Sequence, residues 1–431
     1  MNKLVKKIFI ALGMLALLAA IGIAVLVYVV EHDAGVAYRT GDYEKALALY
    51  RVAADKGDAA AQNAMGIMYE QGQGVEKNLE KAVDWYRLAA EQGLAEAQYN
   101  LGTMLRDGTG VGRDLRAAFG WFIRSAEQGL ALAQNEVGSA YANGEGVARD
   151  VSQAVVWFRK AADQGSAWAQ YNLGVKYWDG EGVMEDLAQA VAWFRTSAEQ
   201  GNAYGQVALG QSYETGFGVA QDHAQALAWY QKAAGQGHAD AYHHLGVLYS
   251  NGWGVAEDPA QAMAWYQKAA DTGHVEAQNN LAARYESGQG VAQDMAQAVQ
   301  WYRKAADKGQ ADAQYNLGRL YEDGSGVAQD SERAIEWYRK AAEQDQANAQ
   351  YALGLAYDEG RTLVQNPAKA LQWYTKAAAQ ENADAQHNIG ALYDQGRGVP
   401  QDVDKAVDWY RKAASNGYAG SKVLRRPAEV Q

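Results

Sequence analysis

The sequence contains no cysteine among its 431 residues. This absence excludes disulfide bonds, thiolate metal sites, a lipid-modified N-terminal cysteine and a cysteine nucleophile. It is compatible with an oxidising compartment but does not assign one.

A surplus of basic residues is also missing, because 51 acidic residues outweigh 39 lysines and arginines and leave a formal net charge of -12. Negative charge repels phosphate backbones, and no local basic stripe interrupts it. We therefore expect no nucleic-acid partner.

Catalytic motifs are absent as well. The chain has no nucleophile elbow, no phosphate-binding glycine-rich loop joined to a strand, and no strand pattern. A GxGxxD motif recurs, but many copies of a turn explain it better than many copies of a cofactor site. The sequence thus predicts a protein that is not an enzyme and uses no cofactor.

Residues 8–30 form an uncharged apolar run of 23 residues. A helix of this length, at about 1.5 Å per residue, spans a hydrocarbon core of about 30 Å. Three lysines precede the run, so the positive-inside rule predicts a cytoplasmic N-terminus at residues 1–7 and one transmembrane signal anchor. The repeats would then lie in the periplasm of a bacterial inner membrane. A cleavable signal peptide is the alternative.

Two further features concern this segment. Small residues that share one face are compatible with self-association of the helix: Gly13, Ala16, Ala20 and Ala24. No proline or flexible linker follows, so we expect the membrane helix to continue into the first helix of residues 31–40.

Ten tryptophans recur every 36 residues without insertion or deletion: Trp85, Trp121, Trp157, Trp193, Trp229, Trp265, Trp301, Trp337, Trp373 and Trp409. With Asp58 as position 1, ten repeats cover residues 58–417 in the pattern AxAQxxLGxxYxxGxGVxxDxxxAxxWYxxAAxxG. Self-similarity at such a period is typical of repeat architectures.

Each repeat predicts two helices. Positions 4, 8 and 12 form one buried face of the first helix, here called helix A, and positions 25, 28, 29, 32 and 33 form one face of the second, helix B. Glycines at positions 15 and 17 predict a defined turn, Asp330 and its equivalents predict N-caps of helix B, and Gly309 and its equivalents predict its C-terminal end. Glycine at position 9 predicts close approach of the Trp-Tyr pair of helix B.

Neither helix can bury its apolar face alone, so repeats must stack on one another. The motif resembles the Sel1-like repeat family, relatives of the tetratricopeptide repeat. This resemblance implies an all-α fold, an α/α right-handed superhelical solenoid, that binds proteins. Residues 31–57 look like an N-terminal capping hairpin, and residues 418–431 like a C-terminal capping helix and tail. Asp345, Thr362 and Glu381 replace repeat glycines, and we expect a locally altered stacking angle there.

The face of helix A at positions 3, 7, 10 and 14 is expected to line a concave groove. Position 7 is asparagine in five repeats, which suggests an amide ladder for a peptide backbone. Local bridging is the alternative. These asparagines are Asn100, Asn172, Asn280, Asn316 and Asn388.

Aromatic residues outside the repeat pattern concentrate in residues 166–273. Trp168 and Tyr204 share position 3 of adjacent repeats, and Phe217 and Trp253 share loop position 16. Exposed aromatic residues are typical of binding hot spots, although they also fill gaps between repeats. We predict a groove for a partner protein or peptide that includes Asn100, Trp168, Asn172, Trp178, Tyr204, Phe217, His244, Trp253, Asn280 and Asn316.

Five of the seven histidines, His223, His238, His243, His244 and His274, fall within or next to this stretch. His243 and His244 are adjacent on a helix and point about 100° apart, so they are poorly placed to share an ion, and we expect no metal. Clustered imidazoles favour a contact surface that responds to mild acid.

The sequence therefore predicts a membrane-anchored scaffold or adaptor that captures a protein partner. An immunity protein that blocks a toxic effector is the alternative, and an envelope enzyme acting on wall material is a second one.

Overall fold

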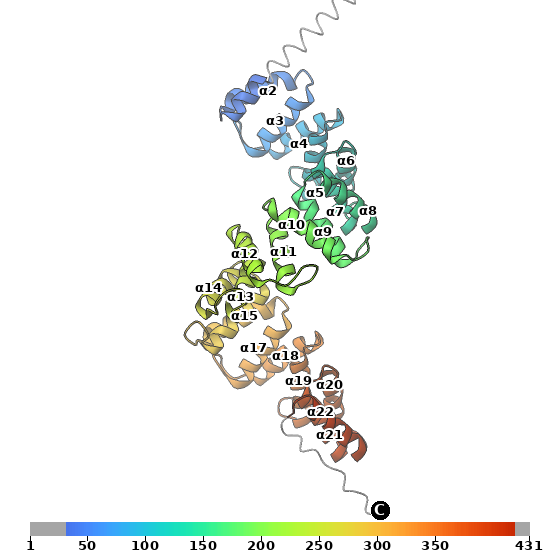
Figure 1. Cartoon of the computed structure of the whole chain (residues 1–431), viewed down its shortest axis with the longest axis vertical. Helices are drawn as coiled ribbons and strands as arrows, with labels where there is room; N and C mark the ends of the chain where they lie inside the picture. Colours follow the sequence, from blue (N-terminus) through green and yellow to red (C-terminus); the bar gives the residue numbers. More distant parts are fainter. Residues whose placement is uncertain (1–31, 419–431) are drawn as a thin grey trace, which may run out of the picture. The chain divides into compact units, whose positions relative to one another are not determined.

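The computed structural model describes residues 32–418, and within this range every regular element is a helix (Figure 1). The chain divides into two units at Gln221 and Asp222, which are described separately below. The all-helical repeat architecture confirms the all-α repeat part of the predicted fold class.

In the first unit, residues 32–39 are helical and are followed by α2 (Tyr43–Ala54), α3 (Ala59–Gln71), α4 (Leu79–Glu91), α5 (Ala95–Asp107), α6 (Leu115–Glu127), α7 (Ala131–Asn143), α8 (Val151–Asp163), α9 (Ala167–Asp179), α10 (Leu187–Glu199) and α11 (Ala203–Thr215).

The second unit contains α12 (His223–Gly235), α13 (Ala239–Asn251), α14 (Pro259–Asp271), α15 (Val275–Ser287), α16 (Met295–Asp307), α17 (Ala311–Asp323), α18 (Ser331–Glu343), α19 (Ala347–Glu359), α20 (Pro367–Ala379), α21 (Ala383–Gln395) and α22 (Val403–Ser415).

From α3 to α22, helices A and B alternate, and within each unit every helix packs against its neighbours in sequence. Most of the predicted core positions are buried. In α17, Ala313, Leu317 and Tyr321 are at most 4% exposed, and Tyr338 of α18 is 2% exposed. Each hairpin thus covers its apolar face with the next one.

The tryptophan of helix B is less buried than the sequence suggests. Trp337 is half-buried, whereas the adjacent Tyr338 is fully packed. The lysine three residues later covers the tryptophan ring instead, with the Lys340 ammonium 3.9 Å from the Trp337 centroid. The tyrosine or phenylalanine at position 29 is therefore the main core residue of helix B.

That ring also explains the glycine inside helix A. A Cβ at Gly174 would lie 2.6 Å from the Phe194 ring, and one at Gly318 would lie 2.7 Å from the Tyr338 ring. Helix propensity alone would favour alanine by about 1 kcal/mol. Close approach therefore fixes glycine here, as predicted, but the partner is the position-29 ring and not the tryptophan.

The predicted caps are present. Asp330 accepts a hydrogen bond from the backbone N–H of Arg333 at 3.0 Å, and an aspartate or asparagine does the same at the start of every helix B from α4 to α22. Gly309, with φ of 92°, follows the end of α16 in the left-handed region. Helix ends therefore follow directly from the repeat sequence.

Loop glycines let each hairpin dock on the preceding one. Gly326 has φ of 71°, and a Cβ there would lie 2.6 Å from the carbonyl carbon of Met295 at the start of α16. Thr362 occupies the same position after α19, and its φ is not positive. The loop after α19 therefore differs in backbone conformation from its equivalents.

The two residues that replace the glycine at position 36 differ from Thr362 in backbone conformation. Asp345 and Glu381 keep the left-handed conformation, with φ of 62° and 63°. The backbone path is thus preserved at both positions, and the altered stacking angle stays a prediction.

The predicted anchor at residues 8–30 and the C-terminal residues 419–431 lie outside the described range. Within residues 32–418, no helix has the length and apolar character needed to span a bilayer.

Candidate functional site

Six rings form a continuous row in the first unit, here called the aromatic strip: Trp168, Tyr171, Trp178, Phe194, Tyr204 and Phe217. Their centroids lie 5.0 Å apart for Trp168 and Tyr204, and 5.7 Å apart for Tyr204 and Tyr171. Phe194 then connects Tyr171 at 6.0 Å to Trp178 at 6.1 Å, and Trp178 lies 6.1 Å from Phe217. The strip therefore runs across α9, α10, α11 and the loop that follows α11.

The strip is exposed at its ends and anchored in its middle. Trp168, Tyr204 and Phe217 are 50%, 45% and 54% exposed, whereas Phe194 is only 3% exposed. Phe194 is the ring that Gly174 accommodates. The exposed rings are thus connected to this packed core residue through Tyr171 and Trp178, which limits their freedom to move.

Position 3 extends this apolar surface to α7, where Leu132 is 52% exposed. Leu132, Trp168 and Tyr204 occupy position 3 of three consecutive repeats. The same exposed position is acidic in five other repeats, at Glu96, Asp240, Glu276, Asp312 and Asp384. An apolar row at this one place is thus a local change in the repeat surface.

Two serines of helix B donate hydrogen bonds to the first turn of a helix A, the turn that carries position 3. Ser197 donates to the carbonyl of Ala167 at 2.6 Å, and Ser125 donates to the carbonyl of Ala95 at 2.7 Å. Because Ala167 precedes Trp168, the first of these bonds fixes the N-terminal turn of α9. Hydrogen bonds between helices therefore position the exposed tryptophan.

The asparagines predicted as a ladder mainly bridge neighbouring repeats. Asn100 donates to Asn63 at 2.9 Å, Asn172 donates to Asn135 at 3.0 Å, and Asn316 donates to Asn279 at 3.4 Å. Each donor amide therefore has an internal acceptor, as the bridging alternative anticipates. A ligand-binding role for these side chains stays a prediction.

The other two asparagines have different acceptors. Asn280 lies 3.2 Å from Nε2 of His243, and Asn388 donates to the Tyr374 hydroxyl at 3.1 Å.

The remaining predicted site residues lie in the second unit. His244 is half-buried and stacks on Tyr230, with centroids 4.6 Å apart, while Trp253 is 41% exposed and stacks on His223 at 5.2 Å. They form local pairs within the second unit. Their role in partner binding stays a prediction.

The histidines surround a pair of acids. His243 and His274 stack with centroids 4.7 Å apart, and His274 lies 3.4 Å from both Asp240 and Glu276. The hydrogen bond from His274 lowers the pKa of Asp240, and burial lowers the pKa of His238. Within the described residues, no group of three or more metal-ligand side chains is arranged to hold an ion.

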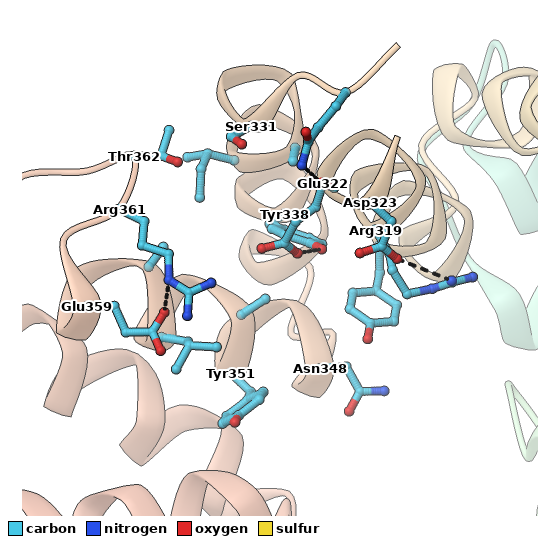
Figure 2. Close-up of a pocket in the computed structure, with 17 residues that line it drawn as sticks. Arg319, Glu322, Asp323, Ser331, Tyr338, Asn348, Tyr351, Glu359, Arg361 and Thr362 are labelled. Carbon is cyan, nitrogen blue, oxygen red and sulfur yellow. Dashed lines mark hydrogen bonds and ion pairs between the residues drawn. The ribbon is translucent and has the colours of Figure 1, made fainter. Parts of the chain in front are cut away.

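The structure also contains a cavity that the sequence did not predict. A cavity of about 730 Å³, here called the tyrosine cavity, lies between α17, α18 and α19, and Tyr315, Tyr338 and Tyr351 line it (Figure 2). Thr362 also lines it, opposite Ser331 at the start of α18. The signal in the sequence was the missing loop glycine, because Thr362 does not adopt the conformation that docks the other loops.

Charged groups surround the tyrosine cavity. Tyr338 donates to Glu322 at 2.6 Å, and Arg361 pairs with Glu359 at 2.7 Å (Figure 2). Burial and Glu322 raise the pKa of Tyr338, so its hydroxyl keeps its proton and remains a donor.

Comparison with known proteins supports the repeat assignment. The Sel1 repeat profile matches residues 21–58, 59–94, 95–130, 131–166, 169–202, 203–238, 239–274, 275–310, 311–346, 347–382 and 383–418. These are eleven repeats, one more than the tryptophan spacing predicts. The additional one contains α2, where Leu49 stands in place of the tryptophan.

Solved structures show the same likeness. The SLR-fold protective antigen c5321 of uropathogenic Escherichia coli is 40% identical over 85% of this chain and 79% of its own, with a TM-score of 0.69. A Sel1 repeat protein from Oxalobacter formigenes is 35% identical over 71% of this chain and 89% of its own, with a TM-score of 0.55. No curated protein sequence matches the chain significantly.

The immunity protein Pa5087 from Pseudomonas aeruginosa is more distant, at 26% identity over 45% of this chain and 74% of its own, with a TM-score of 0.31. This likeness does not bear on the immunity alternative, which stays a prediction.

Proposed function

Because the chain belongs to the Sel1 repeat family, whose helical hairpins stack into protein-interaction scaffolds, we propose that it binds a protein or peptide partner through the aromatic strip and Leu132. The observation that carries this proposal is the row of half-exposed apolar side chains at position 3 of α7, α9 and α11.

The physical argument rests on desolvation. Aromatic rings that are half-exposed and held in place lose apolar contact with water on binding and give up little side-chain entropy. The strip meets both conditions, since Trp168 and Tyr204 contact each other and the row is anchored by buried Phe194. Contiguous exposed apolar surface on a soluble domain is typical of interaction sites.

Photocrosslinking tests this function. A photoreactive phenylalanine at Tyr204 should trap a discrete protein adduct in living cells, and the same residue at Asp384 should not, because Asp384 is the acidic equivalent at position 3. Trp168→Asp should remove the Tyr204 adduct. Equal labelling from both positions, or an adduct that survives Trp168→Asp, would contradict the aromatic strip as the contact surface.

We also propose that the scaffold is anchored in a bacterial inner membrane by residues 8–30, with its repeats in the periplasm. The uncharged run and the lysines before it support this topology. Since the chain has no cysteine, Ser152→Cys, at an exposed residue of α8, introduces one unique thiol. A membrane-impermeant maleimide should label this thiol in cells whose outer membrane is permeabilised, and protection until the inner membrane is lysed would refute the topology.

A further inference from the structure

A glutamate at position 13 of helix A accepts a hydrogen bond from the tyrosine of its own helix B. Tyr302 donates to Glu286 at 2.8 Å, and Tyr338 donates to Glu322 at 2.6 Å. The two glutamates are 36 residues apart and stand in consecutive repeats. They form a matched pair of sites within one chain.

An arginine completes the first of these sites. Arg319, at position 10 of the following repeat, donates through Nη2 to Glu286 and also lies 3.9 Å from Asp323. Asp358, another acid at position 13, is likewise bound by an arginine of the next repeat, since Arg397 donates to its two oxygens at 2.8 and 3.3 Å. In these two cases an acid at position 13 receives a guanidinium group from the next repeat, whereas Glu70, also at position 13, accepts a hydrogen bond from the Tyr86 hydroxyl.

The second site has no such arginine. The residue that corresponds to Arg319 is Leu355, 33 residues after Glu322 just as Arg319 is 33 residues after Glu286. Leu355 lines the tyrosine cavity, and among the described residues the carboxylate of Glu322 contacts the Tyr338 hydroxyl and no cationic side chain. The carboxylate therefore faces a cavity where its counterpart holds an arginine.

The other charges of the cavity are already engaged. Arg361 pairs with Glu359, and Arg319 pairs with Glu286 and Asp323. These two guanidinium groups pair with three carboxylates, and Glu322 is the lining carboxylate that pairs with neither of them.

We propose that the tyrosine cavity binds the guanidinium group of an arginine side chain supplied by a peptide segment, with Glu322 as its carboxylate partner. The volume of about 730 Å³ falls in the range of about 300–1,000 Å³ that is usual for ligand sites. The half-buried rings of Tyr315 and Tyr351 offer aromatic faces, which suit a planar delocalised cation better than a compact ammonium.

This site is separate from the aromatic strip, because the strip lies in the first unit and the cavity in the second. Its arginine can come from a bound partner or from the chain itself, whose sequence after Tyr418 includes Arg425 and Arg426. The chemistry is the same in both cases, and the experiment below separates the two sources.

The test uses the full-length protein and two tripeptides, acetyl-Gly-Arg-Gly-amide and its citrulline counterpart. Citrulline has nearly the same shape as arginine but carries no charge. Ligand-observed NMR titration should show binding of the arginine peptide about tenfold or more tighter than that of the citrulline peptide. Equal affinity of the two peptides would overturn the proposal.

Three variants locate the site. Glu322→Gln, at an exposed residue, should lower the affinity for the arginine peptide by about tenfold while leaving the fold intact. Leu355→Arg should block the peptide, because the introduced side chain takes the place that Arg319 takes beside Glu286. Leu355→Met keeps the volume without a charge and should bind as the wild type does. Binding that is unchanged in both Glu322→Gln and Leu355→Arg would refute the site.

A fourth variant identifies the source. If Arg425→Gln with Arg426→Gln raises the affinity for the arginine peptide, the chain's own arginines compete for the cavity. If affinity is unchanged, the arginine that the cavity receives comes from another molecule. In either case the aromatic strip keeps its partner, so failure here is distinguishable from failure of the proposed scaffold function.

Discussion

The repeats around α9 and the repeat of α19 both depart from the common pattern, but in different parts of the hairpin. In α7, α9 and α11 the change is in exposed side chains at position 3, while the loop glycines Gly182 and Gly218 keep positive φ. After α19 the change is at a loop glycine, and Thr362 gives up the left-handed conformation.

The difference shows that one repeat scaffold can gain a site in two ways. A side-chain change at an exposed position leaves the packing untouched and alters only the chemistry of the surface. A change at a glycine that touches the preceding hairpin alters the packing itself, because a Cβ would overlap the backbone there. The first kind of change accompanies the aromatic strip, and the second accompanies the tyrosine cavity.

The largest effect is expected when threonine replaces a loop glycine near the aromatic strip, because the loop there would then carry the same change as the loop after α19. A Cβ at Gly182 would lie 2.6 Å from the carbonyl carbon of Val151, and φ there is 73°. Left-handed strain together with overpacking predicts that Gly182→Thr lowers the free energy of unfolding by about 3 kcal/mol. Urea denaturation of the full-length protein measures the loss.

The reverse change is the control. Thr362→Gly should allow the loop after α19 to dock on Ser331 and should not destabilise the protein. A Gly182→Thr variant as stable as wild type would show that loss of the glycine alone does not explain the tyrosine cavity.

Truncating the strip should affect binding and not folding. Trp168→Ala removes a half-exposed ring, and hot-spot behaviour predicts a loss of about 2 kcal/mol, or roughly 30-fold, in affinity for the crosslinked partner. Asp384→Ala, at the same position of α21, should change affinity less than about twofold. If the two variants weaken binding equally, position 3 contributes through the general charge of the surface and not through the apolar row.

Much of this fold could be predicted because the repeat spacing fixes it. Most core positions, the N-caps and the turn glycines follow from local sequence, and the structure places them as expected except for the tryptophan at position 28. The prediction that the Trp-Tyr pair lies against the position-9 glycine was only partly right, since Tyr338 and not Trp337 occupies that space. Two adjacent aromatic residues differ by about 100° around a helix, and sequence alone does not say which one faces the core.

The candidate sites were less predictable. Trp168, Tyr204, Trp178 and Phe217 stood out because they depart from the pattern. Phe194 occupies a regular core position and Tyr171 a position that the pattern leaves open, and both join the strip only in space. Leu132 was overlooked because leucine is unremarkable in a helix. The tyrosine cavity depends on three helices and on the backbone conformation of one threonine, which no local pattern specifies.

A smaller effect on stability is expected when glycine is restored at the end of a helix B near α19. Glu381 holds φ of 63°, which is unfavourable for a residue with a Cβ. Glu381→Gly relieves this strain but makes the unfolded chain more flexible, so we expect a net gain of about 0.5 kcal/mol in urea denaturation.

Asp345→Gly provides the matched case. Its carboxylate accepts a hydrogen bond from Gln350 at 3.1 Å, and the substitution removes that bond. It should therefore stabilise less than Glu381→Gly. A larger gain at Asp345 would mean that the strain of the two residues is not comparable.

The smallest expected effect is a difference in pH response between the two units. The first unit contains only His32 among the seven histidines, whereas the second contains the other six. His387 stacks on Tyr418 at 4.1 Å, and burial lowers its pKa while Asp384 acts in the opposite direction. The folded state therefore favours the neutral ring of His387.

The sign of the effect follows from this lowered pKa. The stability that neutral His387 contributes is complete above the unfolded value of about 6.5 and is lost as pH falls through the lower folded value. His387→Phe keeps an aromatic ring at this position without a titratable group, so its urea midpoint should fall less than that of wild type between about pH 7 and pH 5. Hydrogen-exchange protection factors, which are corrected for the intrinsic pH dependence of exchange, should fall at the lower pH in α21 and α22 of the wild type and not in α9 or α10. An equal fall in both units would mean that a general charge effect, and not this histidine, controls the response.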